Sequence, residues 1–94
     1  MRSYEIIYIV HPDLDENAFK EVTDKVNGWI TTAGGEIEKE DLWGKMQLAY
    51  RIRKQKEGHY VFLLAKLPPE FNTELEKNMR FLEPVLRHMI IVVE

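Results

Sequence analysis

The sequence contains no cysteine, so disulfides, thiolate metal sites and thiol nucleophiles are excluded. No apolar run approaches the roughly 20 residues that a membrane-spanning helix needs. A signal-peptide core followed by a small-residue cleavage site is also missing at the start, and we therefore expect a cytoplasmic protein. With 94 residues, the chain is predicted to form a single domain (1–94) with one thin core between two layers.

The chain also lacks an excess of positive charge: 13 Lys and Arg residues face 16 Asp and Glu residues, which gives a formal net charge of −3. This argues against a protein that coats nucleic acid through its overall charge. Five of the basic residues nevertheless fall between Lys45 and Lys56. Such a cluster on an acidic domain is typical either of a local polyanion contact or of an ordinary solvated hairpin.

The hydrophobic pattern predicts four strands and two helices. The strands are expected at 3–10, 36–50, 59–67 and 87–93, where Ile, Val and aromatic residues are frequent. One helix is expected between an aspartate cap, Asp13 or Asp15, and the pair Gly34-Gly35. The other is expected between Pro68 and Pro84. Residues 51–58 are expected to form the turn between the two central strands.

This order predicts an α+β fold of the ferredoxin-like, split β-α-β type. Two right-handed crossovers around a hairpin give β-α-β-β-α-β, with a four-stranded antiparallel sheet and both helices on one face. Charged residues at alternate positions, Glu5, Lys66 and Arg87, mark the opposite, open face. The apolar residues expected on that face include Ile7, Phe62, Leu64, Met89 and Ile91.

An open apolar face usually marks an interface. The alternative is a sheet that is apolar on both sides and partly covered by the long hairpin. The acidic residues of the second strand leave a similar choice, since edge charges protect a sheet from aggregation but also attract a basic partner. These acids are Glu36, Glu38, Glu40 and Asp41.

No catalytic, metal-binding or cofactor-binding constellation is recognisable. The three histidines, His11, His59 and His88, show neither ligand spacing nor a nucleophile nearby. Gly34-Gly35 lacks the further glycines and the lysine of a phosphate-binding loop. We therefore expect no enzyme activity, no metal or other cofactor and no small-molecule substrate.

Two motifs resemble the bacterial small-subunit ribosomal protein six family. The start, Met1-Arg2-Ser3-Tyr4-Glu5, is similar to its N-terminal signature. The central motif is Gly44-Lys45-x-x-Leu48-Ala49-Tyr50-x-Ile52-x-Lys54-x-x-x-Gly58-x-Tyr60. Met46 and His88 stand where the family often has basic residues.

The resemblance implies a structural protein that binds the central domain of small-subunit ribosomal RNA. It also implies a heterodimer with the small basic ribosomal protein eighteen, for which the open apolar face is the expected contact. Transferred by position, the RNA candidates are Arg2, Tyr4, Lys45, Arg51, Lys54, Arg80 and Arg87. We expect Arg2 and Arg87 to lie near the basic hairpin.

Two other functions are compatible with this element order. A small-molecule-sensing or regulatory domain that self-associates would need a polar ligand-binding cluster, and none is recognisable. A small phosphate-ester or acyl-phosphate hydrolase would need a phosphate loop and an arginine after the first strand. The segment His11-Pro12-Asp13 offers neither.

Overall fold

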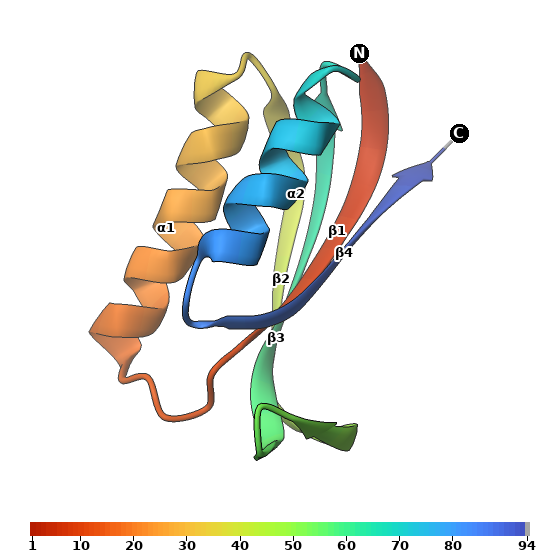
Figure 1. Ribbon diagram of the computed structural model, residues 1–94. Helices are drawn as coiled ribbons and strands as arrows, with labels where there is room; N and C mark the ends of the chain where they lie inside the picture. The colour runs from red at the N-terminus through yellow and green to blue at the C-terminus, as the bar shows by residue number, and fades with distance from the viewer. Residues whose placement is uncertain (94) are drawn as a thin grey trace.

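The computed structural model describes residues 1–93 and confirms the expected fold class (Figure 1). The strands form one antiparallel sheet in the order β2-β3-β1-β4, so β2 and β4 are its edges. Both helices lie on the same face of this sheet. The elements are β1 (Arg2–Val10), α1 (Glu16–Thr32), β2 (Glu36–Ile52), β3 (Gln55–Leu67), α2 (Phe71–Phe81) and β4 (Val85–Val93).

Helix α1 begins and ends where the sequence predicts. Asp15 is its N-cap, and the Asp15 side chain accepts a hydrogen bond of 2.8 Å from the Ala18 amide. After the helix, Gly34 adopts a φ of +88°, which an L side chain rarely tolerates. Gly35 approaches β3 so closely that a Cβ there would lie 2.6 Å from the Lys66 carbonyl oxygen. The Gly-Gly pair is therefore required by both backbone conformation and packing.

The core lies between the sheet and the helices. Alternate residues of the two central strands point into it, and Val22, Val26, Ile30, Leu75 and Met79 of the helices meet them. The strand contributions are Tyr4, Ile6, Tyr8 and Val10 from β1, and Val61, Leu63, Ala65 and Leu67 from β3. Residues of the other parity face away from the helices, which confirms the expected side-chain alternation.

The turn between β2 and β3 is much shorter than predicted. The strands continue to Ile52 and from Gln55, so only Arg53 and Lys54 form the turn, both with positive φ. Because β1 ends at Val10, opposite His59, residues 46–58 extend beyond the neighbouring strand. We call residues 46–58 the hairpin arm; it is the green hairpin at the bottom of Figure 1. The prediction of a turn over 51–58 was wrong because the strand register continues through the charged segment.

Candidate RNA and partner-protein interfaces

The first basic surface lies on and beside the hairpin arm. Lys45, Arg51, Lys54 and Lys56 are all exposed and line a shallow hollow next to Pro12, in which four basic groups outnumber the two carboxylates of Asp13 and Glu57. Among residues 1–93, no carboxylate oxygen lies within 4.0 Å of the charged nitrogens of these four. Their charge is therefore available to an anion, and the structure brings together three of the RNA candidates predicted from the sequence.

A second basic surface is a groove between the end of α2 and β4. Arg53, Arg80 and Arg87 line this hollow of about 530 Å³, which we call the arginine groove. Arg53 reaches it from the turn of the hairpin arm and donates to the carbonyl oxygens of Glu83, at 3.1 Å, and Val85. These acceptors are neutral, so the guanidinium charge remains. Arg53 was not among the residues predicted from the sequence, since a turn residue gives no sign of reaching β4.

Two of the sequence expectations for RNA binding were wrong in their geometry. Arg2 pairs with Leu67 at the far end of β1, whereas Arg87 pairs with Ile9. The seven residues from Arg2 to Ile9 span about 24 Å of strand, so Arg2 does not lie near the arm. Tyr4 is only 4% exposed and belongs to the core. It packs beneath the helices and offers no surface for a base or a phosphate.

The open face of the sheet carries the predicted apolar residues, but some of them are partly covered. The Trp43 ring stacks on Phe62, with 5.6 Å between ring centroids and 9° between planes, and also lies over Tyr60. Trp43 itself is 47% exposed, and Met89 and Ile91, across the open face on β4, are 46% and 42% exposed. The exposed apolar surface of the open face therefore includes Trp43 together with the predicted residues. The sequence contained one indication of this arrangement, the glycine that follows Trp43, because a glycine within a strand often marks a bulge. In the structure Gly44 has a φ of +86°, and the register of β2 shifts between Leu42 and Gly44.

The hairpin arm adds a wall to the open face. Between Gln47 and Ile52 the register of β2 against β3 shifts, and this irregular segment carries Tyr50 toward β4. The Arg87 guanidinium lies 5.7 Å from the centre of the Tyr50 ring, within cation–π range. An apolar cavity of about 360 Å³ lies between this wall, Trp43 and Met89. Arg87 thus borders both the arginine groove and the apolar face.

Comparison with known proteins bears on what these surfaces do. The family model described as ribosomal protein S6 matches residues 3–92 of the chain. The chain belongs to the ribosomal protein S6 family. The small ribosomal subunit protein bS6 of Clostridium botulinum (strain Hall) is 42% identical over 94 residues, which is the whole of both chains. The bS6 protein of Clostridium kluyveri is 42% identical over 91 residues, or 97% of this chain and 96% of its own.

A solved structure agrees with the ferredoxin-like fold of this S6-family chain. The crystal structure of 30S ribosomal protein S6 from Thermotoga maritima superposes with a TM-score of 0.92 at 26% identity. The match covers 98% of this chain and 87% of the Thermotoga chain. Neither helix of the described part of the chain is long and apolar enough to cross a membrane.

The acidic residues of the S6-family chain lie on an edge strand, as expected, and most contact neighbours within the chain. Glu38 lies 3.8 Å from the Lys66 ammonium, and Asp41 lies 3.5 Å from that of Lys39. Glu40 accepts a hydrogen bond of 3.1 Å from the Asn27 side chain. These contacts favour protection of the β2 edge, while the exposed Glu36 remains available to a basic partner.

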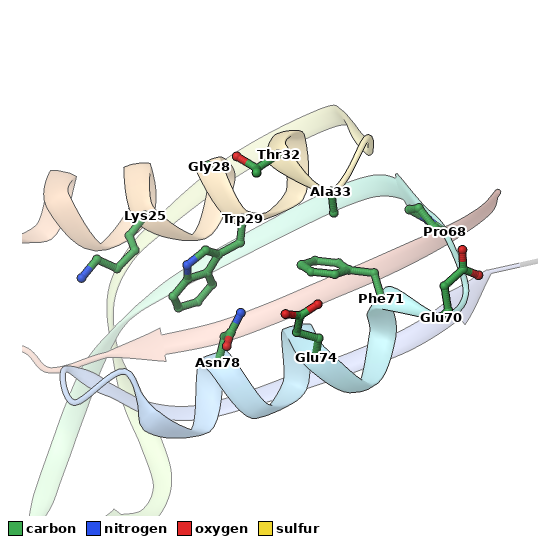
Figure 2. Close-up of a pocket in the computed structure, with 10 residues that line it drawn as sticks. All are labelled: Lys25, Gly28, Trp29, Thr32, Ala33, Pro68, Glu70, Phe71, Glu74 and Asn78. Carbon is green, nitrogen blue, oxygen red and sulfur yellow. The ribbon is translucent and has the colours of Figure 1, made fainter.

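The largest hollow on the helical face does not suit RNA. It lies between α1 and α2 and has a volume of about 670 Å³. Figure 2 shows the Trp29 and Phe71 rings between the two helices, with Glu74 on α2, Glu70 immediately before α2 and Lys25 on α1. Two carboxylates against one ammonium would repel a phosphate backbone. The basic surfaces of this S6-family protein are therefore at the arm and at β4.

The pKa values of Tyr8 and His88 are shifted mainly because the protein removes these side chains from water. The Tyr8 hydroxyl has no hydrogen-bond partner among residues 1–93, and burial, with a smaller contribution from Glu40, raises the pKa of Tyr8. His88 lies half-buried on β4, and desolvation lowers its pKa below 6.5, with Glu76 opposing and Arg80 adding to the shift. Within residues 1–93, no three His, Asp or Glu side chains gather as a metal site requires.

We expect His88 to make folding stability dependent on pH. Because its pKa is lowered in the folded state, the unfolded chain binds the proton more readily. The stabilisation is fully present above the unfolded pKa of about 6.5 and is lost as the pH falls through the folded pKa. The melting temperature should therefore decrease more between about pH 7.5 and 5.5 in the wild type than in His88→Gln. Equal decreases in the two proteins would show that His88 does not carry this effect.

Proposed function

We propose that this protein is a structural component of the cytoplasmic small ribosomal subunit. It binds the central domain of small-subunit ribosomal RNA together with the small basic ribosomal protein eighteen. It acts as one domain, without catalysis, metal, other cofactor or small-molecule substrate. Membership of the ribosomal protein S6 family supports the ribosomal role, and the arrangement of its surfaces supports the two contacts.

The observation that carries the proposal is the position of Arg87. Its guanidinium borders the arginine groove on one side and the apolar open face on the other. A chain with a net charge of −3 thus gathers arginines, which bind phosphates through a planar fork, directly beside an exposed apolar surface. A protein that holds RNA and a second protein at the same time needs one surface for each, and here the two candidate surfaces meet at Arg87.

The RNA contact is assigned to the two basic surfaces. Arg80 and Arg87 of the arginine groove, joined by Arg53, supply three guanidinium groups at one place. Lys45, Arg51 and Lys54 extend this charge along the hairpin arm. Arg2, at the other end of β1, would make a separate contact. Tyr4 is not assigned to the RNA contact, because its side chain belongs to the core.

The partner contact is assigned to the open face. Removal of exposed apolar area from water supplies the affinity, and a basic partner offsets the net negative charge of this chain. Trp43 is added here as a large, half-exposed aromatic side chain, the kind of residue that dominates binding energies at interfaces. The residues of this contact are Ile7, Trp43, Phe62, Leu64, Met89 and Ile91.

The proposal is tested by assembly from purified components. We expect this protein, ribosomal protein eighteen and a transcribed central-domain RNA fragment to form a ternary complex in a gel-shift titration. The logarithm of the binding constant should fall linearly with the logarithm of the salt concentration, by somewhat less than one unit for each phosphate contact. An RNA fragment of equal length from another rRNA domain is the control.

Equal binding to both RNA fragments would contradict the assignment to the central domain. Absence of a complex with either RNA, with or without the partner, would contradict the RNA-binding function itself. In that case the open face and the α1–α2 groove would remain to be explained by a regulatory domain of the same fold.

A further inference from the structure

The two edges of the sheet differ in how they are protected. Along β2 the register is interrupted between Ile37 and Lys39 and again between Leu42 and Gly44, and the strand carries charged residues through its first half. Bulges and charges of this kind prevent a second strand from pairing with an edge. The β2 edge is therefore protected against pairing with another strand.

The β4 edge has no such protection over most of its length. Residues 87–93 pair with β1 without a register shift, and the run from Met89 to Val93 contains no charge, proline or glycine. Met89, Ile91 and Val92 are each more than two-fifths exposed. In Figure 1, β4 forms the outer border of the sheet with no element beyond it. An exposed apolar edge strand is a template for pairing with another strand.

Val85, the first residue of β4, already uses its backbone carbonyl and amide in hydrogen bonds within the chain. The Val85 carbonyl accepts from Arg53, and the Val85 amide donates to the Leu82 carbonyl at 3.0 Å. The free part of the edge is thus residues 87–93, and its midpoint is Ile90. The position of Arg53 therefore limits both the length and the centre of any strand pairing.

We propose that the β4 edge pairs with the β4 edge of a second copy of this chain. The two strands run antiparallel about a two-fold axis at Ile90, and the two sheets join into one of eight strands. In this register Met89 lies opposite Ile91 of the second copy, and His88 lies opposite Val92. Arg87 lies opposite Val93, so the two Arg87 side chains do not face each other.

A second copy suits this edge better than a segment of a basic protein. From Met89 to Val93 the free part of the strand is apolar on both faces, with Met89 and Ile91 on the open side and Val92 on the helical side. It therefore presents no carboxylate that would select a basic segment, and an identical apolar strand matches it on both faces. Antiparallel pairing in the plane of the sheet leaves the open faces of both copies accessible, so the proposed partner contact is not required for it.

The absence of cysteine allows a direct test of the register. Met89→Cys and Ile91→Cys are prepared separately, one with a purification tag, and oxidised mildly either alone or as a mixture. Directly opposed residues have Cα atoms about 4.5–5.5 Å apart, which suits a disulfide, whereas identical residues here would lie about 8 Å apart. We expect the mixture to cross-link much faster than either variant alone. Equal rates in all three samples would overturn the register.

Sedimentation at increasing protein concentration tests the association itself. The wild type should pass from one chain to two, and Val92→Lys should remain a monomer because a charge blocks an edge. Leu42→Lys, an exposed apolar position on β2, is the matched control and should dimerise as the wild type does. A wild type that stays monomeric, or a Leu42→Lys variant that alone loses dimerisation, would overturn the proposal.

Two further results would assign the β4 edge or the open face to a different contact. Loss of the dimer in Phe62→Ala but not in Val92→Lys would place the second copy on the open face and overturn the edge assignment. If the protein stays monomeric while Val92→Lys weakens binding of ribosomal protein eighteen, the edge belongs to that partner. Neither RNA nor partner is needed for the dimer, so a failed ternary complex would leave this test unaffected.

Discussion

Replacement of both Arg80 and Arg87 by glutamate should reduce affinity for the central-domain RNA and its partner complex by about 10- to 100-fold at moderate salt. Both guanidinium groups line the arginine groove, and Arg80 has only a long, exposed ion pair of 3.9 Å with Glu76. Two lost phosphate contacts should also flatten the salt dependence by about two units of slope. Gel-shift titrations at several salt concentrations measure both quantities.

A matched control separates the groove from overall charge. Lys20→Glu together with Lys25→Glu changes the net charge by the same amount, but on α1, away from β4. Lys20 has an exposed ion pair with Asp24, at 2.9 Å, whose loss should affect folding little. We expect this variant to bind RNA nearly as the wild type does. An equal loss of affinity in both double variants would mean that long-range charge, and not the arginine groove, governs binding.

Two adjacent residues of β3 should respond in opposite ways to truncation. Phe62 lies on the open face beneath Trp43, whereas Leu63 is fully buried in the core. Phe62→Ala should fold and weaken the heterodimer with ribosomal protein eighteen by about 1–3 kcal/mol, as expected for an interface aromatic. Leu63→Ala should instead lower the free energy of unfolding by about 2–5 kcal/mol, because it leaves a cavity in the core.

Thermal unfolding of each variant and calorimetric titration with the partner separate the two effects. Loss of several kcal/mol of stability in Phe62→Ala would show that the Trp43–Phe62 stack supports the fold and would complicate its assignment to an interface. Unchanged partner affinity with unchanged stability would exclude the open face as the contact. The exposed Glu36 and its neighbours on β2 would then be the next surface to test.

The parts of the fold that follow simple periodicity were predictable. Glu5, Lys66 and Arg87 identified the open face correctly, because a charge seldom points into a core and strand side chains alternate. The helix cap at Asp15 and the Gly-Gly ending were also predictable, since each rests on local chemistry. These features require knowledge of only a few neighbouring residues.

The features that were missed depend on long-range register. Nothing local shows that Arg53 reaches a carbonyl 32 residues away, or that Trp43 stacks on Phe62 after a register shift. The burial of Tyr4 followed from the same alternation that placed Glu5 on the open face, yet the resemblance placed it among the RNA contacts. The distance between Arg2 and the arm became clear only from strand pairing.

The contact of Arg53 with the α2–β4 segment has a consequence for the entropy of binding. A hairpin that extends beyond its sheet would ordinarily sample many orientations and would lose this freedom when it docks on RNA. Here the two hydrogen bonds from Arg53 to Glu83 and Val85 hold the tip against the body of the protein before any ligand arrives. The ordering is completed during folding, so less of the interaction energy is lost to ordering when the complex forms.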